Sequence, residues 1–522
     1  MKAGMDGASR RWTGWVAAAL VAVAAGLAAA AGQTPPARLH LVIVVDGLRP
    51  DQVTAEVMPH LHALAARGVR FTRHHSVFPT VTRVNAATFV TGVLPARHGL
   101  LGNSIYIPSA DPVRPIDTAD HEALLKVAAA EGRLLTAPTL GQMLAGAGKR
   151  LLVVSSGSSG SALLLSPTDD AGVILHTQFA RPESWRARSV ALLGPTPPAG
   201  LPNAARNRYA TDLLLRLGLP EVRPDVVFLW YSDPDTTAHA RGLDAAETRA
   251  ALTAVDGEIG RVEDWLRDQG RLAATNLVVT SDHGFATYTG GFDLPALVKP
   301  FVRPMADGTP DIVVAGGAIH FRVPPEDARV RAVVEALQRA PAVGAIFMAS
   351  PLPAGRSPAA AVPGTLSHDL VGWGHPRAAQ LLASPAWTDA VAAGMRGTSS
   401  ANGTAGHGST SPFEVTNTLL AAGPDFRERV VSDVATGNVD ITPTLLRLAG
   451  VAAPASAFDG RVIAEALRGD AGSGPRAAVG GAAGGIVTRV PAPFGYQAEA
   501  RVTEVSGVRY FDSATATRRP PP

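Results

Sequence analysis

Three short apolar runs that are rich in β-branched residues stand out along the chain. They are LHLVIVVDG at residues 39–47, VVFLWYSDPDTTAH at 226–239 and NLVVTSDHG at 276–284. Longer segments with helical periodicity separate them, including an amphipathic segment at 244–270. Continuous apolar runs that alternate with helices are typical of parallel strands buried on both faces. The pattern predicts an α/β fold with a doubly wound, mostly parallel sheet and helices on both faces.

Acidic residues or histidines follow each of these runs. The carboxyl ends of parallel strands lie at one edge of a sheet, where ligands bind in such folds, so we expect these polar side chains to meet there. Carboxylates and imidazoles together bind hard and borderline divalent cations. Taken alone, Asp46 favours an ordinary turn, and a histidine before glycine is more often a loop residue than a metal ligand. Together they predict a metal site made of Asp46, Asp235, His239, Asp282, His283 and His407.

The remaining pattern divides the chain into further parts. A main domain is predicted at residues 36–470, with a Pro/Gly-rich irregular insertion near 348–378. Residues 471–485, AGSGPRAAVGGAAGG, have the composition of a flexible linker. Residues 486–522 contain an alternating segment with Ser506-Gly507 as its turn, which predicts a C-terminal β hairpin.

The N-terminus has the features of a targeting segment. Lys2, Arg10 and Arg11 precede the apolar stretch WVAAALVAVAAGLAAAA, and small residues lie before Gln33. This order is typical of a secretory signal peptide, here residues 1–32. The alternative is an uncleaved membrane anchor, but the weak hydrophobicity of an Ala-rich stretch favours cleavage. We therefore expect a periplasmic or secreted protein with no stable membrane span after cleavage.

The composition of the chain excludes several kinds of function for this protein. The 522 residues are 46% hydrophobic, enough for a large core, and the net charge of +3 arises without any Lys/Arg-rich run. The chain therefore lacks the basic stripe typical of proteins that bind nucleic-acid duplexes. Because it has no cysteine, a disulfide framework, a thiolate zinc site and a cysteine nucleophile are excluded. The oligomeric state stays open.

A threonine is the candidate nucleophile. VTRVNAATFVTGV predicts a helix that begins near Thr82, and a hydroxyl there would lie where free backbone N–H groups favour an anion. A metal or a base must remove the hydroxyl proton before the oxygen can attack. The alternative is that Thr80 and Thr82 only cap the helix.

These motifs resemble the alkaline phosphatase superfamily, in its nucleotide pyrophosphatase/phosphodiesterase branch. The resemblance rests on VVDGLRPD, FPTVTRVNAATFVTGVLPARHGLLGN, YSDPDTTAHARG, SDHGF, GHGS and NVDITPTLLRL, in that order. It implies that residues 36–470 form an alkaline phosphatase-like catalytic domain. It also implies two zinc ions, cleavage of phosphodiester or pyrophosphate bonds in a small phosphoester substrate, and a phosphothreonine intermediate.

The resemblance further implies a role for each motif residue. Thr82 would be the nucleophile, and Asn103, with the backbone N–H of Thr82, would hold a non-bridging oxygen of the substrate. The implied ligands of the zinc ion that activates the nucleophile are Asp46, Thr82, Asp282 and His283. The implied ligands of the second zinc ion are Asp235, His239 and His407.

Two departures from the family pattern bear on the substrate. Superfamily members that prefer phosphate monoesters carry a Lys and an Arg two residues apart after a strand such as LLVVSSG. This chain has SSGSSGSALL there, at residues 155–164, so a diester is the expected substrate. The nucleotide-cleaving members place an aromatic residue after the nucleophile. This chain has Arg83, which could stack on a base or bind a second anionic group.

Two alternatives stay open. One is a phosphomonoesterase of the same superfamily. The other is a non-catalytic relative that binds metal or phosphoesters, whose mark would be a missing ligand or nucleophile.

Overall fold

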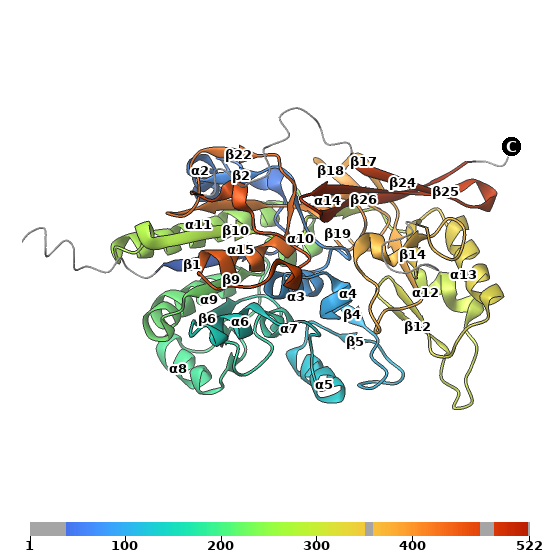
Figure 1. Cartoon of the computed structure of the whole chain (residues 1–522), viewed down its shortest axis with the longest axis horizontal. Helices are drawn as coiled ribbons and strands as arrows, with labels where there is room; N and C mark the ends of the chain where they lie inside the picture. The colour runs from blue at the N-terminus through green and yellow to red at the C-terminus, as the bar shows by residue number, and fades with distance from the viewer. Residues whose placement is uncertain (1–37, 350–358, 470–484, 520–522) are drawn as a thin grey trace, which may run out of the picture. The chain divides into compact units, whose positions relative to one another are not determined.

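A mixed β-sheet forms the centre of the structure (Figure 1). The computed structural model describes residues 38–349, 359–469 and 485–519, and within them nine strands belong to this sheet. Their order is β22 (Val430–Ser432), β2 (Val69–Phe71), β21 (Leu419–Ala422), β10 (Thr275–Thr280), β1 (Leu39–Val45), β9 (Val226–Tyr231), β6 (Leu151–Ser155), β7 (Val173–His176) and β8 (Ala180–Arg181). The strands from β10 to β7 are parallel, whereas β21 and β8 run antiparallel to them.

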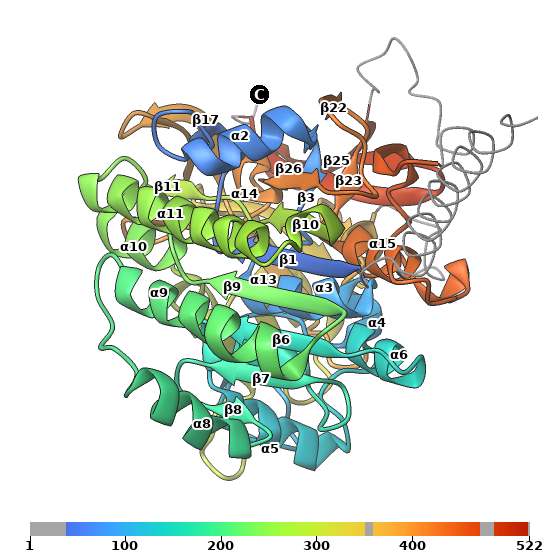
Figure 2. The same ribbon diagram turned by 90° about the vertical axis from the view of Figure 1, so that its left-hand side faces the viewer.

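Helices cover both faces of this sheet, as Figure 2 shows. Leu41 and Ile43 of β1 pack toward one set of helices, and Val42 and Val44 pack toward the other. Because both faces are covered, every residue of β1 is buried, which explains why all of them except His40 are apolar. The first set is α2 (Pro59–Arg67), α9 (Ala204–Leu213) and α11 (Ala246–Asp268); the second includes α3 (Thr82–Thr91), α6 (Leu140–Gly146), α7 (Ser159–Leu165) and α15 (Ile441–Leu448). The predicted α/β fold is confirmed.

The three strands that carry the acidic motifs end side by side. β1 lies between β10 and β9, with Val44 opposite Thr280 and Val45 opposite Tyr231. The chain therefore leaves the three strands at one edge of the sheet. The segments that follow them meet at this edge, among them α10 (Asp235–Arg241).

Smaller sheets and helices make up the rest of the described chain. One sheet has the order β12 (Ile312–Ala315), β13 (Ala318–Phe321), β16 (Leu381–Pro385), β14 (Val343–Met348) and β15 (Leu366–Ser367). Another has the order β17 (Trp387–Ala392), β18 (Met395–Ser399), β11 (Ala286–Tyr288) and β19 (Ala405–Gly406). The short strands β20 (Thr416–Asn417), β3 (His74–His75) and β23 (Thr436–Gly437) pair with one another, as do β4 (Ser104–Ile105) and β5 (Ile116–Asp117). Further helices are α4 (Pro95–His98), α5 (His121–Glu131), α8 (Ser184–Leu193), α12 (Leu294–Val298), α13 (Asp327–Arg339) and α14 (Pro412–Val415), and a π-helical segment, Leu214–Val222, continues α9.

The C-terminal residues form an antiparallel sheet of β24 (Ile486–Pro491), β25 (Tyr496–Val505) and β26 (Val508–Arg518). The predicted hairpin is β25–β26, and Ser506 and Gly507 both have positive φ at its turn, as a type I′ turn requires. Sequence analysis missed β24, which adds a third strand at one side of the hairpin. The sheet packs on the preceding part of the chain, where the Tyr496 hydroxyl donates to the Gly344 carbonyl at 2.9 Å.

Several sequence predictions concern residues that the structure does not describe, or only partly describes. The predicted signal peptide and all but the last residue of the predicted linker lie outside the described residues. Residues 350–358 of the insertion also lie outside them, and the described remainder is largely irregular around β15. Within the described ranges, no helix is both long and apolar enough to cross a membrane.

Candidate active site

The strand-end carboxylates are joined to one another by backbone contacts. Asp46 follows β1, Asp282 lies two residues beyond β10, and Asp235 begins α10. The Asp46 N–H donates to the Tyr231 carbonyl, and the Asp235 N–H donates to the Asp46 carbonyl, both at 3.1 Å. The Gly47 N–H donates to Asp282 Oδ1 at 3.1 Å. The main chain therefore fixes the relative positions of the three acidic side chains.

Two histidines face Asp235. His239 lies one helical turn along α10, and His407 follows β19. Their Nε2 atoms lie 3.2 Å and 3.3 Å from Asp235 Oδ1. One potential ligand atom from each of the three residues lies within 4.8 Å of the others, close enough to share one metal ion.

A second group of possible ligands adjoins the first. Potential ligand atoms of Asp46, Asp235 and His283 also lie within 4.8 Å of one another, so Asp235 belongs to both groups. His283 Nε2 lies 3.1 Å from Asp282 Oδ2 and 3.6 Å from Asp46 Oδ1. The rings of His283 and His407 stack with centroids 3.4 Å apart, so the two groups are contiguous.

All three histidines make the same kind of hydrogen bond, from Nδ1 to a backbone carbonyl. His239 Nδ1 lies 2.9 Å from the Ala405 carbonyl, His283 Nδ1 lies 2.9 Å from the Gly284 carbonyl, and His407 Nδ1 lies 2.8 Å from the carbonyl of Thr80. A carbonyl oxygen only accepts, so each Nδ1 must carry the proton. Each neutral ring then presents the Nε2 lone pair to the carboxylates, which is the arrangement of a metal-binding histidine.

Each of the three carboxylates also has an oxygen without a hydrogen bond among the described residues. These buried atoms are Asp46 Oδ1, Asp235 Oδ1 and Asp282 Oδ2. A buried carboxylate oxygen without a partner is costly, because the charge has lost its water and gained nothing in return. Three such oxygens that face three Nε2 lone pairs need a positive charge between them. The residues present therefore fit divalent cations, and the mixture of oxygen and nitrogen donors suits zinc.

The pKa values divide the cluster: the carboxylates of Asp235 and Asp282 outweigh burial and raise the pKa of His239 and His283, whereas the pKa values of Asp46 and His407 shift toward the neutral forms of these side chains. Burial, together with the charges of Asp282 and Asp235, raises the pKa of Asp46 well above its usual range. Burial and the neighbouring His283 lower the pKa of His407 to about 4, so this imidazole is neutral at neutral pH. A bound cation would favour the ionised carboxylate and the neutral ring, the forms that ligate metal.

Thr82 lies beside this cluster at the start of α3. Its hydroxyl is 3.3 Å from His283 Nε2. The N-cap residue of α3 is Val81, and no side chain caps the helix. The Thr80 hydroxyl instead donates to the Ser409 carbonyl at 2.9 Å. The interpretation of Thr80 and Thr82 as helix caps is therefore wrong, because both hydroxyls take part in other contacts.

Asn103 and Arg83 lie next to the nucleophile candidate. Asn103 Oδ1 accepts a hydrogen bond from the Arg83 N–H at 3.1 Å, which fixes the orientation of the amide. Among the described residues, Asn103 Nδ2 and the Thr82 N–H make no hydrogen bond. Arg83 has no ion pair there either, and its Nε is buried without a partner. Burial lowers the pKa of Arg83, while carboxylates including Asp46 oppose that shift.

Two buried residues that support the cluster were missed by sequence analysis. Trp230, at the end of β9, donates from Nε1 to Asp46 Oδ2 at 2.9 Å. Asn438 donates from Nδ2 to the Asp282 carbonyl and to Asn85 Oδ1, both at 2.9 Å, and so ties the Asp282 segment to helix α3. Trp230 looks like an ordinary core residue in an apolar run. Asn438 had a signal, since it begins the motif NVDITPTLLRL.

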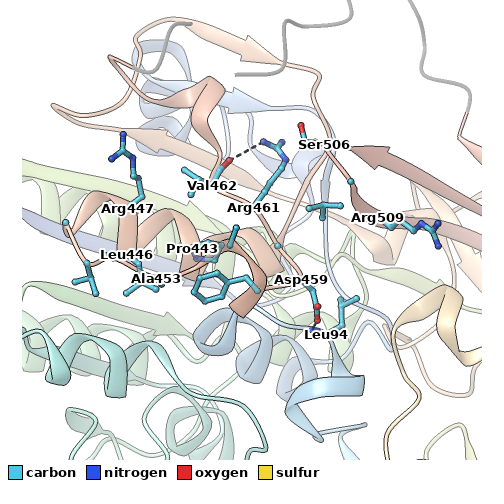
Figure 3. Close-up of a pocket in the computed structure, with 18 residues that line it drawn as sticks. Leu94, Pro443, Leu446, Arg447, Ala453, Asp459, Arg461, Val462, Ser506 and Arg509 are labelled. Atoms are coloured by element: carbon cyan, nitrogen blue, oxygen red, sulfur yellow. Dashed lines mark hydrogen bonds between the residues drawn. The ribbon is translucent and has the colours of Figure 1, made fainter. Parts of the chain in front are cut away.

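A cavity of about 820 Å³ lies between α15 and the turn of the C-terminal hairpin (Figure 3). None of the candidate site residues lines it. Two of its arginines are already paired, Arg461 with Glu465 at 2.6 Å and Arg509 with Glu504 at 3.3 Å. The chemistry of the candidate site therefore does not extend to this cavity.

Comparison with known proteins agrees with the fold and the motifs. A family model for type I phosphodiesterase/nucleotide pyrophosphatase matches residues 40–410. This chain belongs to that family of phosphodiesterases and pyrophosphatases. Venom phosphodiesterase of Macrovipera lebetinus is 26% identical over 253 residues, which is 47% of this chain and 25% of the relative. Ectonucleotide pyrophosphatase/phosphodiesterase family member 3 of Mus musculus is 22% identical over 255 residues, 47% of this chain and 24% of the relative.

A solved structure shows the same architecture. Murine ectonucleotide pyrophosphatase/phosphodiesterase 5, studied as an inactive variant in complex with AMP, superposes with a TM-score of 0.58 at 18% identity. The match covers 82% of this chain and 99% of that one. The matched part of this chain spans only about a quarter of the curated relatives' length.

Proposed function

We propose that this protein cleaves phosphodiester or pyrophosphate bonds with two zinc ions and Thr82 as nucleophile. The observation that supports this most directly is the buried cluster of carboxylate oxygens without hydrogen bonds. These oxygens face histidine Nε2 atoms. The Thr82 hydroxyl lies 3.3 Å from one of these nitrogens, Nε2 of His283. Membership of the phosphodiesterase family gives the reaction class.

The ligand sets are those that the family resemblance implies; one coincides with the group Asp235, His239 and His407, and the other shares Asp46 and His283 with the second group. Asp46, Thr82, Asp282 and His283 would hold one ion, and Asp235, His239 and His407 would hold the other. Bound zinc would supply positive charge at the phosphate and lower the pKa of a hydroxyl or water. The carbonyls that bind Nδ1 of the three histidines would keep the rings in the ligating orientation.

The chain's own residues would then carry out two displacements. Thr82 Oγ1 would lose its proton and form a bond to phosphorus while the bond from phosphorus to the leaving oxygen breaks, and that oxygen would depart with the electron pair and take up a proton. Water would then lose a proton and form a bond to phosphorus while the bond from phosphorus to Oγ1 breaks, and Oγ1 would take up a proton to restore the hydroxyl. Asn103 Nδ2 and the Thr82 N–H, which have no partner among the described residues, would hold a non-bridging oxygen at the start of α3.

The segment at residues 155–164, which contains no Lys or Arg, supports a diester substrate. In residues 155–164 the serine hydroxyls bind the protein itself: Ser156 donates to Asn207 Oδ1 at 2.6 Å, and Ser161 donates to the Ser158 carbonyl at 2.8 Å. They are therefore not free for a phosphate. A diester carries one negative charge at phosphorus, whereas a monoester carries close to two near neutral pH. The extra charge of a monoester would find no cation here.

A second candidate function is phosphomonoester hydrolysis, and Arg83 is the observation that favours it. Arg83 follows the nucleophile and has no ion pair among the described residues. Its guanidinium could take the second charge of a monoester, or an anionic group of a diester beyond the scissile phosphate.

The decisive assay compares matched nitrophenyl diester and monoester substrates in the parent, Arg83→Ala and Arg83→Lys. We expect a higher kcat/KM for the diester in all three, and loss of both activities after chelation of the metal. A parent that favours the monoester, with the preference lost in Arg83→Ala and kept in Arg83→Lys, would instead establish the second candidate.

The place of action is part of the proposal. The N-terminal segment predicts export to the periplasm or the medium. Sequencing the N-terminus of the protein recovered from those fractions would test this, with cleavage expected just before Gln33. Recovery of the intact N-terminus from the cytoplasm would contradict it.

A further inference from the structure

We infer that Glu414 and Thr80 are positioning residues that hold the His407 loop against the segment leading to Thr82. The inference rests on the proposed zinc site, because it concerns how one ligand and the nucleophile keep their relative positions. Neither residue belongs to the ligand sets implied by the family resemblance.

Thr80 contacts the His407 loop through both its backbone and its side chain. Its carbonyl lies 2.8 Å from His407 Nδ1 and so fixes the ring that presents Nε2 to Asp235. Its hydroxyl accepts from the Gly408 N–H at 3.0 Å and donates to the Ser409 carbonyl at 2.9 Å. Thr80 is fully buried and lies two residues before Thr82. A shift of this short segment would therefore move a metal ligand and the nucleophile together.

Glu414 holds the other side of the same loop. Its Oε2 accepts from the Ser409 N–H at 2.6 Å, and its Oε1 accepts from the Ser409 hydroxyl at 2.7 Å. The Thr80 hydroxyl lies 3.4 Å from Oε2. The Glu414 carbonyl accepts from the Gly284 N–H at 2.8 Å, one residue beyond His283. One buried residue thus contacts the segments that carry the nucleophile and a ligand of each proposed zinc ion.

The chemistry explains why a carboxylate occupies this position. In the structure the Ser409 N–H donates to Oε2 and the Ser409 hydroxyl donates to Oε1, so the ionised side chain accepts at both oxygens. Glutamine would place an NH₂ group against one of these donors and leave it without an acceptor. Glu414→Gln therefore keeps the shape of the side chain and loses one of the two contacts with Ser409.

The test measures Zn²⁺ affinity, by competition with a chelator, together with kcat and KM for a nitrophenyl diester. Thr80→Val and Glu414→Gln should each lower the affinity of one zinc site and kcat by about tenfold or more, the scale seen when groups that orient ligands are removed. Thr80→Ser should stay close to the parent because it keeps the hydroxyl. Ser409→Ala removes only the hydroxyl contact with Glu414, so it should also lower Zn²⁺ affinity and kcat, but by a smaller factor.

Thr275→Val is the matched control. Thr275 is equally buried and its hydroxyl donates to the Arg271 carbonyl at 2.9 Å, at the start of β10 and far along the strand from Asp282. This variant should lose thermal stability but keep the parental Zn²⁺ affinity and kcat. The contrast separates a positioning role from a general loss of stability.

Two outcomes would overturn the inference. If the parent binds Zn²⁺ while Thr80→Val, Glu414→Gln and Ser409→Ala all match its affinity and kcat, only the positioning role fails. If the parent binds no Zn²⁺, the proposed function fails and the inference fails with it.

Discussion

Trp230→Phe tests whether the hydrogen bond to Asp46 orients a functional carboxylate. Trp230 is fully buried at the end of β9, and its Nε1 donates to Asp46 Oδ2 at 2.9 Å. The other oxygen, Oδ1, has no hydrogen bond in the described chain. The indole therefore holds one oxygen and leaves the other for a cation. Phenylalanine keeps an aromatic ring in the core but cannot donate.

The expected loss has two parts. Removing a hydrogen bond to a carboxylate costs about 1.5–3 kcal/mol. The smaller ring leaves a cavity of roughly 40 Å³, which costs about 1 kcal/mol at the rate measured for core cavities. We therefore expect Trp230→Phe to lower the free energy of unfolding by about 2.5–4 kcal/mol. Zinc affinity and kcat/KM should fall by about 10–100-fold, because the carboxylate is free to rotate.

Tyr231→Phe is the control on the same strand. Tyr231 packs on the opposite face of the sheet from Trp230, and its hydroxyl lies 2.8 Å from Thr211 Oγ1. Its loss should cost about 1 kcal/mol of stability without changing zinc affinity. The measurements are urea unfolding, chelator competition and diester kinetics on both variants. Parental zinc affinity and kcat/KM in Trp230→Phe would refute the argument, whatever the change in stability.

Three further predictions address the nucleophile, the metal and pH. Thr82→Ala should lose nearly all turnover and Thr82→Ser should keep much of it, with a phosphorylated Thr82 peptide trapped from the parent; undiminished turnover in Thr82→Ala would mean that water attacks directly. Elemental analysis of protein purified without added metal should find about two zinc ions per chain, and His407→Ala should lose one and abolish activity; full activity without metal would contradict this. Burial raises the pKa of Asp440 to about 6 from 3.8. In the unfolded chain Asp440 loses its proton at a lower pH than in the folded protein. The free energy of unfolding should therefore fall by up to about 3 kcal/mol as pH rises from the unfolded to the folded pKa. Urea unfolding in chelator should show a steeper slope in the parent than in Asp440→Asn, in which Glu414, whose pKa burial raises to about 7, still contributes; equal slopes would show that Asp440 is not the cause.

Much of the fold could be predicted because its signals are local. A strand buried on both faces needs a mostly apolar sequence, and in β1 every residue except His40 is apolar. The hairpin turn at Ser506-Gly507 likewise follows from the positive φ values that a two-residue turn requires. β24 escaped prediction because it is a short edge strand whose outer positions are mostly exposed, so it carries little hydrophobic pattern.

The sequence indicated which polar side chains lie at the ends of strands. Only the tertiary structure determined which of them are neighbours and which atoms are in contact. Asp46, Asp235 and Asp282 come together because β9 and β10 both pair with β1, an order that no local pattern records. The same holds for Trp230 on Asp46 and for the Thr80 carbonyl on His407, since each contact joins residues far apart in the chain. The spacing of apolar residues along the sequence determines which face of a helix or strand is buried. The partner of each polar atom depends on strand order and loop path, and these are settled only when the whole sheet has formed.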